Sequence, residues 1–319
     1  MRSVERRWNV LVSAPRALPV IDRYQSELEP RGCALKVQPV VERLEEAELL
    51  PLVGDVDGII CGDDRITARV LAAAPRLRVI AKWGTGIDSI DVAEAARRGV
   101  VVRNTPNAFS EPVADTVLGY ILMFARQLDL MTTDMRAGLW QRRQLTSLGE
   151  RTLGIIGFGS CGRAVARRAA AFGMRILAYD VRPLSDAPGE RGQVTQVPLD
   201  TLLAEADFVT LHADLNPGSH HLLDGPRLQL LKRTAFLVNT SRGALIDEAA
   251  LVEALRNGRP AGAALDVFEE EPLPADSPLR DFANVQLAPH SANSSPAAAE
   301  RVHANTIHNI LQVLGTSSL

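Results

Sequence analysis

Four short stretches of this chain carry the residue types used for carboxylate binding and proton transfer. Arg242 stands directly after an apolar run, where its planar guanidinium could hold a carboxylate and polarise a neighbouring carbonyl. His290 follows Pro289, and the acidic residue Glu271 lies earlier in the same part of the chain. A histidine paired with a carboxylate is a common proton donor, because the negative charge stabilises the imidazolium and orients the ring. The four stretches are residues 82–88, 239–243, 266–272 and 289–293.

The first of these stretches is a turn bracketed by Gly84 and Gly86 after an apolar run. The exposed amides of such a turn suit a carboxylate. Lys82 precedes the turn, and it is one of three lysines among 35 basic residues. We interpret it as a compact cation beside an anionic substrate, with chance retention of a lysine as the alternative.

A different signal follows the apolar run at 153–156, where Gly157, Gly159 and Gly162 form a Gly-x-Gly-x-x-Gly pattern. The first glycine permits a tight turn, the second lets the backbone approach a pyrophosphate, and the third allows a following helix to pack closely. The next strand-like run ends at Asp180, where the ribose 2′-hydroxyl of a dinucleotide needs a carboxylate acceptor. Together these features predict a dinucleotide site.

Each candidate residue also has a plainer interpretation. Arg242 could be one more surface arginine, Glu271 could belong to a solvated acidic turn, and His290 could be a structural histidine. His212 follows a strand-like run, but a structural role is at least as well supported, so we do not expect it to be catalytic.

Composition narrows the class of protein. The 319 residues are 46% hydrophobic and 23% charged, which suffices for two domains, and the formal net charge is −3. This balance gives no electrostatic basis for binding nucleic acid or an anionic membrane, and no apolar run is long enough to span a bilayer. The start of the chain lacks the apolar core of a signal peptide, and Cys33, Cys61 and Cys161 have neither disulfide nor metal-ligand spacing. We expect a cytoplasmic protein without a metal site.

Short β-branched runs alternate with helix-like segments, a pattern typical of parallel sheets with right-handed crossovers. The fold class is therefore α/β, with two doubly wound parallel-sheet domains of Rossmann and flavodoxin-like type. We place a substrate domain at 1–103 plus 293–319, completed by a helix at 295–314, and an NAD-binding Rossmann domain at 104–292. Strands are expected at 9–13, 35–37, 57–62, 77–82, 100–103, 153–156, 175–180, 208–212, 235–239, 262–267 and 285–287.

The segment between the two domains has its own signals. Residues 104–107 form a turn and an expected hinge. Ser110 followed by Pro112 predicts an N-cap and a first-turn proline. The helix that follows is apolar around much of its circumference, so we expect it to be buried between domains or subunits. A further helix is expected at about 128–137, before Trp140.

Taken together, the motifs resemble those of the D-isomer-specific 2-hydroxyacid dehydrogenases, nearest to the D-3-phosphoglycerate dehydrogenase-like branch. The resemblance covers essentially the whole chain, from the turn at 84–88 to Pro289-His290, and its specific motifs are 157–162, 238–243 and 265–272. It implies NAD-dependent interconversion of a D-2-hydroxy acid and its 2-oxo acid. It also implies a homodimer built largely through the helices after the hinge.

The same resemblance assigns roles to particular residues. Arg242 holds the carboxylate and carbonyl of the substrate, His290 is the acid/base, Glu271 is its partner, and Asp266 contacts the nicotinamide end of the cofactor. The implied cofactor set is Thr85, Gly157, Gly159, Ser160, Cys161, Gly162, Asp180, Ala213, Thr240, Ser241, Asp266, His290 and Ala292. The implied substrate set is Lys82, Trp83, Gly84, Thr85, Gly86 and Arg242.

Two positions depart from the family pattern. Family members often carry a longer polar or basic residue at the position of Ser160 and an aliphatic one at that of Cys161, so one phosphate contact is expected to be absent. Cys161 at a helix N-terminus could have a depressed pKa, although a packing role is the favoured interpretation. Asp180 favours NAD, because a carboxylate repels a 2′-phosphate, while Arg182 keeps NADP open.

Several functions fit these motifs. The expected ligand is a small anionic 2-hydroxy or 2-oxo acid, and the same machinery could reduce glyoxylate or hydroxypyruvate or oxidise a phosphorus oxyanion. From another class, this fold also serves as an NAD(H)-sensing corepressor that binds protein partners. The intact set of Arg242, Glu271 and His290 favours catalysis, although fold alone does not determine function.

Overall fold

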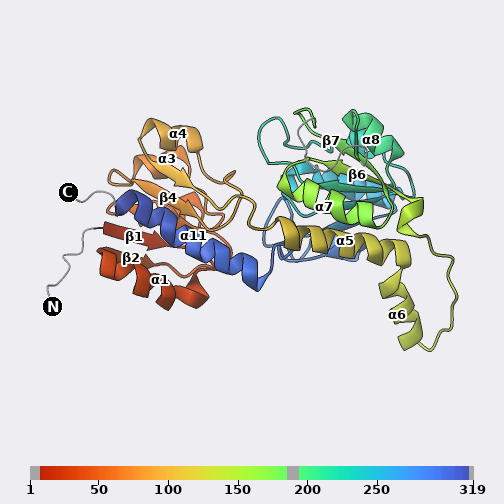
Figure 1. Cartoon of the computed structure of the whole chain (residues 1–319), viewed down its shortest axis with the longest axis horizontal. Coiled ribbons are helices and arrows are strands. Elements are labelled where there is room, and N and C mark those ends of the chain that lie inside the picture. Colours follow the sequence, from red (N-terminus) through yellow and green to blue (C-terminus); the bar gives the residue numbers. More distant parts are fainter. Residues whose placement is uncertain (1–7, 185–193, 316–319) are drawn as a thin grey trace. The chain divides into compact units, whose positions relative to one another are not determined.

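The computed structural model describes residues 8–184 and 194–315, and the chain divides into two compact units. Unit 1 comprises Met1–Ala108 and Ser295–Leu319, and unit 2 comprises Phe109–Ser294. Each unit contains one β-sheet covered by helices (Figure 1). No helix in the described ranges combines the length and apolar character that crossing a membrane requires.

The sheet of unit 1 has five parallel strands in the order β2-β1-β3-β4-β5. From β1 the chain adds β2 on one side and β3, β4 and β5 on the other side. The topological switch point therefore lies between β1 and β3. All five strands are at positions that the sequence predicted. Their bounds are β1 Trp8–Val12, β2 Cys33–Val37, β3 Gly58–Cys61, β4 Val79–Lys82 and β5 Val101–Arg103.

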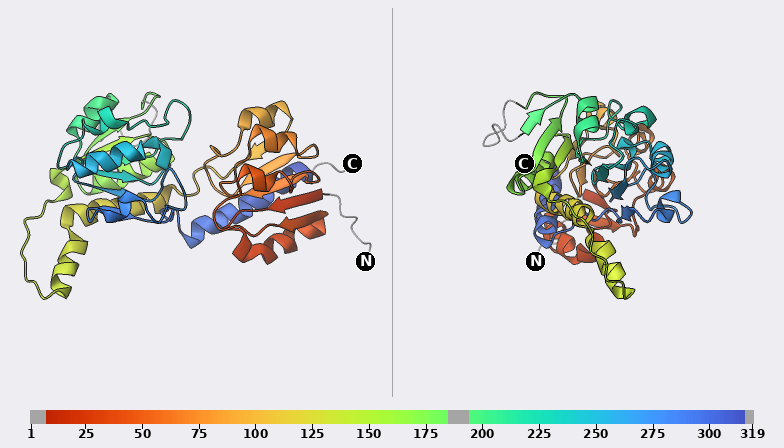
Figure 2. Two further views of the ribbon diagram at one scale, coloured as in Figure 1. Left: turned by 180° about the vertical axis from the view of Figure 1, so that it is seen from behind. Right: turned by 90° about the vertical axis from the view of Figure 1, so that its right-hand side faces the viewer.

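Both faces of this sheet are buried, which explains why its strands are apolar runs rather than alternating ones. Leu11 and Ile59 point into a cluster with helices α2 (Glu46–Leu49), α3 (Ala68–Ala72) and α4 (Val92–Arg97). Val10 and Ile60 point to the other face, toward α1 (Ile21–Leu28) and α11 (Pro296–Leu314). The C-terminal helix α11 therefore completes the core of unit 1, beside α1, as expected (Figures 1 and 2).

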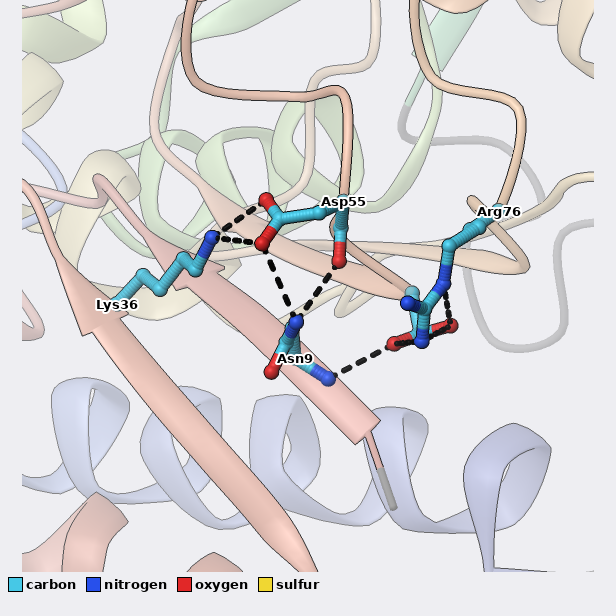
Figure 3. Close-up of polar contacts among 5 residues, drawn as sticks. Asn9, Lys36, Asp55 and Arg76 are labelled. Atoms are coloured by element: carbon cyan, nitrogen blue, oxygen red, sulfur yellow. Dashed lines mark hydrogen bonds and ion pairs between the residues drawn. The ribbon is translucent and has the colours of Figure 1, made fainter. Parts of the chain in front are cut away.

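A polar network fastens the amino-terminal edge of the unit 1 sheet (Figure 3). Asn9 donates its backbone N–H to Asp57 over 2.8 Å and its side-chain amide to the Asp55 carbonyl over 2.9 Å. Arg76 pairs with the buried Asp57 over 2.9 Å, and Lys36 pairs with Asp55. These groups are paired with one another by hydrogen bonds and ion pairs at the edge where the strands begin. Ligand-binding residues are therefore expected at the opposite, carboxyl edge of the sheet.

The sheet of unit 2 has seven parallel strands within the described residues, in the order β12-β11-β10-β9-β6-β7-β8. Its switch point lies between β6 and β9. Six of these strands were predicted, whereas β8 was not, because its exposed Thr195 and Gln196 give it no apolar pattern. The bounds are β6 Thr152–Ile156, β7 Arg175–Tyr179, β8 Val194–Gln196, β9 Phe208–Leu211, β10 Phe236–Asn239, β11 Gly262–Leu265 and β12 Val285–Leu287.

Helices cover both faces of this second sheet. One face packs against α8 (Leu199–Glu205), α9 (Gly225–Leu228) and α10 (Glu248–Arg256). On the other, α7 (Ser160–Ala171) contacts β6 and β7, and α5 (Ser110–Arg126) packs along α7 and contacts β10 (Figure 1). The observed layers are those of a doubly wound domain.

Helix α5 differs from the prediction at its first residue. Ser110 is not its N-cap: it is the first helical residue, and Phe109 occupies the cap position without a capping hydrogen bond from its side chain. The Ser110 hydroxyl accepts a weak hydrogen bond from the Cys161 thiol, with 3.9 Å between Oγ and Sγ. The hydroxyl therefore connects α5 to α7, the helix on which α5 packs.

Helix α6 (Leu128–Arg136) projects from the rest of unit 2, and none of its residues is buried (Figures 1 and 2). Its apolar side chains Leu128, Leu130 and Met135 are exposed, as are Leu139 and Trp140 just after it. Trp140 is 77% exposed, which is unusual for a large aromatic side chain in a monomer.

Candidate active site

The glycine turn between β6 and α7 lies at the switch point of the unit 2 sheet. Gly157 has a φ of +89°, and a Cβ there would lie 2.5 Å from the Ala213 nitrogen. A Cβ on Gly162 would lie 2.3 Å from the Gly157 carbonyl oxygen, whereas one on Gly159 would meet nothing within 4 Å. Packing within the protein thus requires the first and third glycines, and the second faces open space that a pyrophosphate could occupy.

Other features of unit 2 also fit a dinucleotide. The N-cap residue of α7 is Gly159, which has no side chain to cap the helix, so the amides of the first turn are oriented for an anion. The Asp180 carboxylate follows β7 and accepts hydrogen bonds from the backbone N–H groups of Phe158, over 2.8 Å, and Arg182, over 2.9 Å. This acid is therefore fixed beside the glycine turn. The Thr240 hydroxyl is buried and has no hydrogen-bond partner within the described ranges, as expected of a group that awaits a ligand.

The Arg242 loop is held by Asn239 and Gly243, which lie in the same motif as Arg242 and have structural roles there. Asn239, which is fully buried at the end of β10, accepts from Ser241 N over 3.1 Å and donates to the Arg242 carbonyl over 2.8 Å. A Cβ on Gly243 would lie 1.9 Å from the carbonyl carbon of Phe268. This residue must therefore be glycine, because its backbone lies directly against the segment that carries Glu271.

Glu271 and His290 form a pair in unit 2. Nδ1 of His290 lies 2.9 Å from Oε2 of Glu271, while Oε1 of Glu271 accepts the backbone N–H of Phe268 over 3.0 Å. An ionised carboxylate only accepts hydrogen bonds, so we assign the proton of the neutral imidazole to Nδ1. This assignment leaves Nε2 as the ring nitrogen that can exchange a proton with a substrate.

Asp266 holds the turn that carries His290. Its buried carboxylate accepts the backbone N–H groups of Ser291 and Ala292, each over 2.8 Å, and its carbonyl accepts that of His290. His290 has a φ of +49°, an uncommon conformation for a non-glycine residue. Burial raises the pKa of Asp266, while the two amides act in the opposite direction. The carboxylate thus stabilises the backbone geometry at the catalytic candidate.

In unit 1, the turn after β4 lies at the carboxyl edge of the sheet. Gly84 has a φ of +136°, and its carbonyl accepts the backbone N–H of Thr105 over 2.8 Å. The Thr85 hydroxyl donates to the Thr105 carbonyl over 3.0 Å. The glycine-bracketed turn is therefore fastened to the segment that follows β5.

The Lys82 side chain has partners within unit 1. Its Nζ donates to the Gly62 carbonyl and to Oδ1 of Asp63, each over 2.6 Å, and the residue is 2% exposed. Asp63 follows β3 at the switch point of this sheet and its side chain is 34% exposed. The positive charge that the sequence offered for a substrate is thus largely neutralised by this neighbouring carboxylate.

Two further residues behave as structural groups. Burial raises the pKa of the Cys161 thiol, so the depressed pKa considered for it is wrong, because enclosure outweighs the position at the helix start. Burial lowers the pKa of His212 to about 4, and its Nε2 lies 3.0 Å from the Thr210 hydroxyl. His212 is thus neutral at neutral pH and hydrogen-bonded locally, as its plainer interpretation predicted.

Comparison with known proteins agrees with this geometry. Residues 118–292 match the family model described as "D-isomer specific 2-hydroxyacid dehydrogenase, NAD binding domain". A glyoxylate reductase of Korarchaeum cryptofilum is 43% identical over 270 residues, which are 82% of this chain and 81% of that protein. A hydroxypyruvate reductase of Thermotoga maritima is 38% identical over 281 residues, which are 86% of this chain and 90% of that protein.

A solved structure resembles the whole chain. It is the D-lactate dehydrogenase of Aquifex aeolicus, crystallised with NAD and lactic acid. The two chains are 26% identical, have a TM-score of 0.87, and match over 97% of this chain and 95% of that one.

The fold and these matches define a class: an NAD-dependent oxidoreductase built from two parallel-sheet α/β domains. The chain belongs to the D-isomer-specific 2-hydroxyacid dehydrogenase family, and it interconverts a D-2-hydroxy acid and its 2-oxo acid.

Proposed function

We propose that this protein reduces a small, unphosphorylated 2-oxo acid such as glyoxylate or hydroxypyruvate, with Arg242, Glu271 and His290 as its catalytic residues. The observation that carries the proposal is the 2.9 Å contact between His290 Nδ1 and Glu271 Oε2, on a segment whose backbone touches the Arg242 loop. The relatives named glyoxylate reductase and hydroxypyruvate reductase support this choice of substrate.

His290 supplies the proton in this proposal. A bound NADH would supply the hydride for C2 of the 2-oxo acid. The imidazolium of His290 donates its Nε2 proton to the carbonyl oxygen, so that the product is a hydroxyl rather than an alkoxide. Glu271 stabilises the imidazolium by its negative charge and keeps the ring oriented through Nδ1. In the reverse direction, Nε2 takes the hydroxyl proton.

Arg242 binds and polarises the substrate. Its guanidinium can hold the carboxylate with a planar pair of donors and draw electron density from the adjacent carbonyl. We also assign the substrate carboxylate to the amides of the turn in unit 1, with Trp83, Gly84, Thr85 and Gly86. We include Lys82 among the proposed substrate-binding residues because it directly precedes this turn.

The cofactor is assigned mainly to unit 2. Gly157, Gly159, Gly162 and the start of α7 would hold the pyrophosphate, with Asp180 on the adenosine ribose. The carboxylate of Asp180, fixed by two backbone amides, favours NAD over NADP. The remaining members are Thr85, Ser160, Cys161, Ala213, Thr240, Ser241, Asp266, His290 and Ala292.

The pairing of Lys82 supports a small substrate over a phosphorylated one. A phosphate would need an available cation, yet the Lys82 ammonium is enclosed against Asp63. A second carboxylate, that of Asp64, is buried nearby and accepts from Ser13 over 2.5 Å and from Leu44 N over 2.7 Å. A substrate related to 3-phosphoglycerate remains the second candidate, on the resemblance to that branch.

We further propose that unit 1 is the substrate domain, that unit 2 with its matched segment is the NAD-binding domain, and that the protein is a cytoplasmic homodimer. The exposed apolar side chains of α6 and of Leu139 and Trp140 support the homodimer, because a second copy would cover them. No nucleic acid or membrane partner is proposed, since the net charge of −3 favours neither.

A substrate panel tests the function. NADH oxidation is followed with glyoxylate, hydroxypyruvate, pyruvate, phenylpyruvate and 3-phosphohydroxypyruvate, in the native protein and in His290→Ala. We expect glyoxylate or hydroxypyruvate to have the highest kcat/KM and His290→Ala to lose at least about a hundredfold in kcat. A clear preference for 3-phosphohydroxypyruvate would overturn the proposed substrate class, and retained activity in His290→Ala would overturn the proposed acid.

A further inference from the structure

A buried polar group in unit 1 links the start of the proposed substrate turn to the C-terminal helix. Nδ1 of His303, on α11, lies 3.0 Å from Nε1 of Trp83 and 2.8 Å from the hydroxyl of Tyr24, on α1. Tyr24 is fully buried and His303 is 8% exposed. The rings also pack on one another, with centroids 5.4 Å apart for Trp83 and His303. Such buried and satisfied networks constrain the groups that they join.

The chemistry of the three groups determines the protonation of His303. The indole N–H of Trp83 can only donate, so Nδ1 of His303 must accept and the ring proton lies on Nε2. The Tyr24 hydroxyl lies 2.8 Å from the same nitrogen and is also hydrogen-bonded to Trp83 and Thr306. Burial lowers the pKa of His303, and Arg23 acts in the same direction, so the ring stays neutral and remains an acceptor.

Trp83 connects this network to the backbone of the turn. The backbone N–H of Trp83 donates to the Cys61 carbonyl over 2.9 Å. The next residue is Gly84, which has a φ of +136°. The partly buried indole packs against the apolar cluster between the sheet and α11. The side chain of Trp83 thus points into unit 1 and anchors the turn from inside.

Helix α11 holds the other side of the turn as well. The Asn305 side-chain amide donates to the Asn104 carbonyl over 3.2 Å and to the Thr105 hydroxyl over 3.0 Å. Thr105 in turn binds the Gly84 carbonyl and accepts from the Thr85 hydroxyl. One helix therefore holds residues 83–85 at two points, through His303 with Trp83 and through Asn305 with Thr105.

We propose that His303 is a positioning residue for substrate binding, which holds the Trp83 indole and thereby fixes the amides of Gly84, Thr85 and Gly86 that receive the substrate carboxylate. This inference rests on the proposed function of the turn. It assigns Trp83 the role of an internal anchor, so that neither Trp83 nor His303 needs to touch the reacting atoms.

The expected kinetic signature is a change in KM. A carboxylate is bound alike in the ground state and the transition state, so loosening its amides weakens both equally. In His303→Leu, the Trp83 indole loses the ring nitrogen that faces it and keeps only a weaker hold through Tyr24, which itself also bonds to Thr306. We expect KM for glyoxylate to rise about tenfold, with kcat and the affinity for NADH within about twofold of the native values.

Matched variants separate positioning from general damage. His303→Asn restores an acceptor, because Asn Oδ1 lies close to the place of His Nδ1, and it should recover most of the native KM. His308→Leu makes the same substitution at an exposed position of α11 and should leave KM unchanged. Trp83→Phe removes the donor and should raise KM, and adding His303→Leu to it should raise KM little further. Circular dichroism and Tm confirm folding, and if His303→Leu is unfolded, His303→Asn and Trp83→Phe decide.

Several results would overturn the inference. These are an unchanged KM in folded His303→Leu or Trp83→Phe, a His303→Asn variant as impaired as His303→Leu, or independent, multiplicative effects in the double variant. Equal losses in kcat and NADH affinity would point to general damage and also overturn it.

A binding assay keeps this test separate from that of the proposed function. Oxamate, a non-reacting carboxylate analogue, is titrated into the NADH complex and detected by the fluorescence of NADH. If the native protein turns over no 2-oxo acid, the proposed function fails while oxamate binding still tests the anchor. We then expect about tenfold weaker oxamate binding in His303→Leu and near-native binding in His303→Asn. Equal binding in native protein and His303→Leu, or no oxamate binding to the native protein, would overturn the anchor.

Discussion

Replacing Glu271 by glutamine tests the acid/base pair with a minimal change of shape. The glutamine can still accept the Phe268 N–H, but it removes the negative charge from beside His290. Its amide group can also donate to Nδ1, which would favour the tautomer with the proton on Nε2. Both effects act against an imidazolium that transfers its Nε2 proton.

The magnitude follows from the geometry of the pair. At 2.9 Å between Nδ1 and Oε2, two unit charges attract by about 1.4 kcal/mol in water and about 6 kcal/mol at an effective dielectric constant of about 20. The two side chains are 23% and 17% exposed, which places the interaction between these limits, at about 2–4 kcal/mol. Since about 1.4 kcal/mol corresponds to a factor of ten, we expect kcat to fall about 30- to 1000-fold.

Steady-state reduction of glyoxylate by NADH, measured from acid to alkaline pH, is the assay. Because the imidazolium is less stable without Glu271, the decline of kcat with rising pH should begin at a lower pH in the variant. Glu270→Gln is the matched control, since it removes a charge from the same acidic run at an exposed position, and it should keep near-native kcat. A Glu271→Gln enzyme with kcat within threefold of native and an unshifted pH profile would refute the assignment of the pair.

Three further predictions follow from individual residues. Gly243→Ala forces a Cβ to within 1.9 Å of the Phe268 carbonyl carbon, and it should cost about 3 kcal/mol of stability with a large loss of activity. The control is Gly119→Ala, in open space on α5, which should be neutral or raise Tm. Equal Tm values for the two variants would contradict the packing argument. Asp180→Ser should shift the ratio of kcat/KM for NADPH over NADH upward by about tenfold, since a repulsive charge is removed, and an unchanged ratio would count against its ribose role. The pKa of His212 is about 4, below its usual 6.5, so the unfolded chain binds a proton that the folded protein does not, and stability falls as pH drops through this window. Urea titrations at pH 8 and pH 5 give the free energy of unfolding of each protein. Between these two pH values, the native protein should lose about 1 kcal/mol more stability than His212→Gln, since solvent screens the partly exposed imidazole. Equal losses in the two proteins would disprove the assignment.

Local sequence determined much of this protein. Apolar runs and glycine positions are properties of neighbouring residues, so the strands, the turn at Gly157 and the long helices α5 and α11 could be predicted from them. The exceptions have local reasons too. Strand β8 is polar and so lacks the apolar pattern that predicts a strand, and the proline after Ser110 favours a cap at a position that is already helical.

The candidate catalytic residues were also recognisable in the sequence, because their motifs place them after strands whose carboxyl ends share one edge. What could not be predicted is the set of partners that fixes them. Asn239 and the Phe268 amide act locally on Arg242 and Glu271, whereas the Gly243 backbone packs against that of Phe268 and so joins two segments that are separate in the chain.

Tertiary structure alone decided the role of charges and rings whose partners are distant in the chain. In sequence Lys82 was a cation before a turn, and packing placed Asp63 against it. His303 carried no signal at all, yet it meets Trp83 from a helix at the far end of the chain. The physical reason is that periodicity and turn geometry are set by adjacent residues, whereas the burial and pairing of a polar group depend on which distant element folds against it.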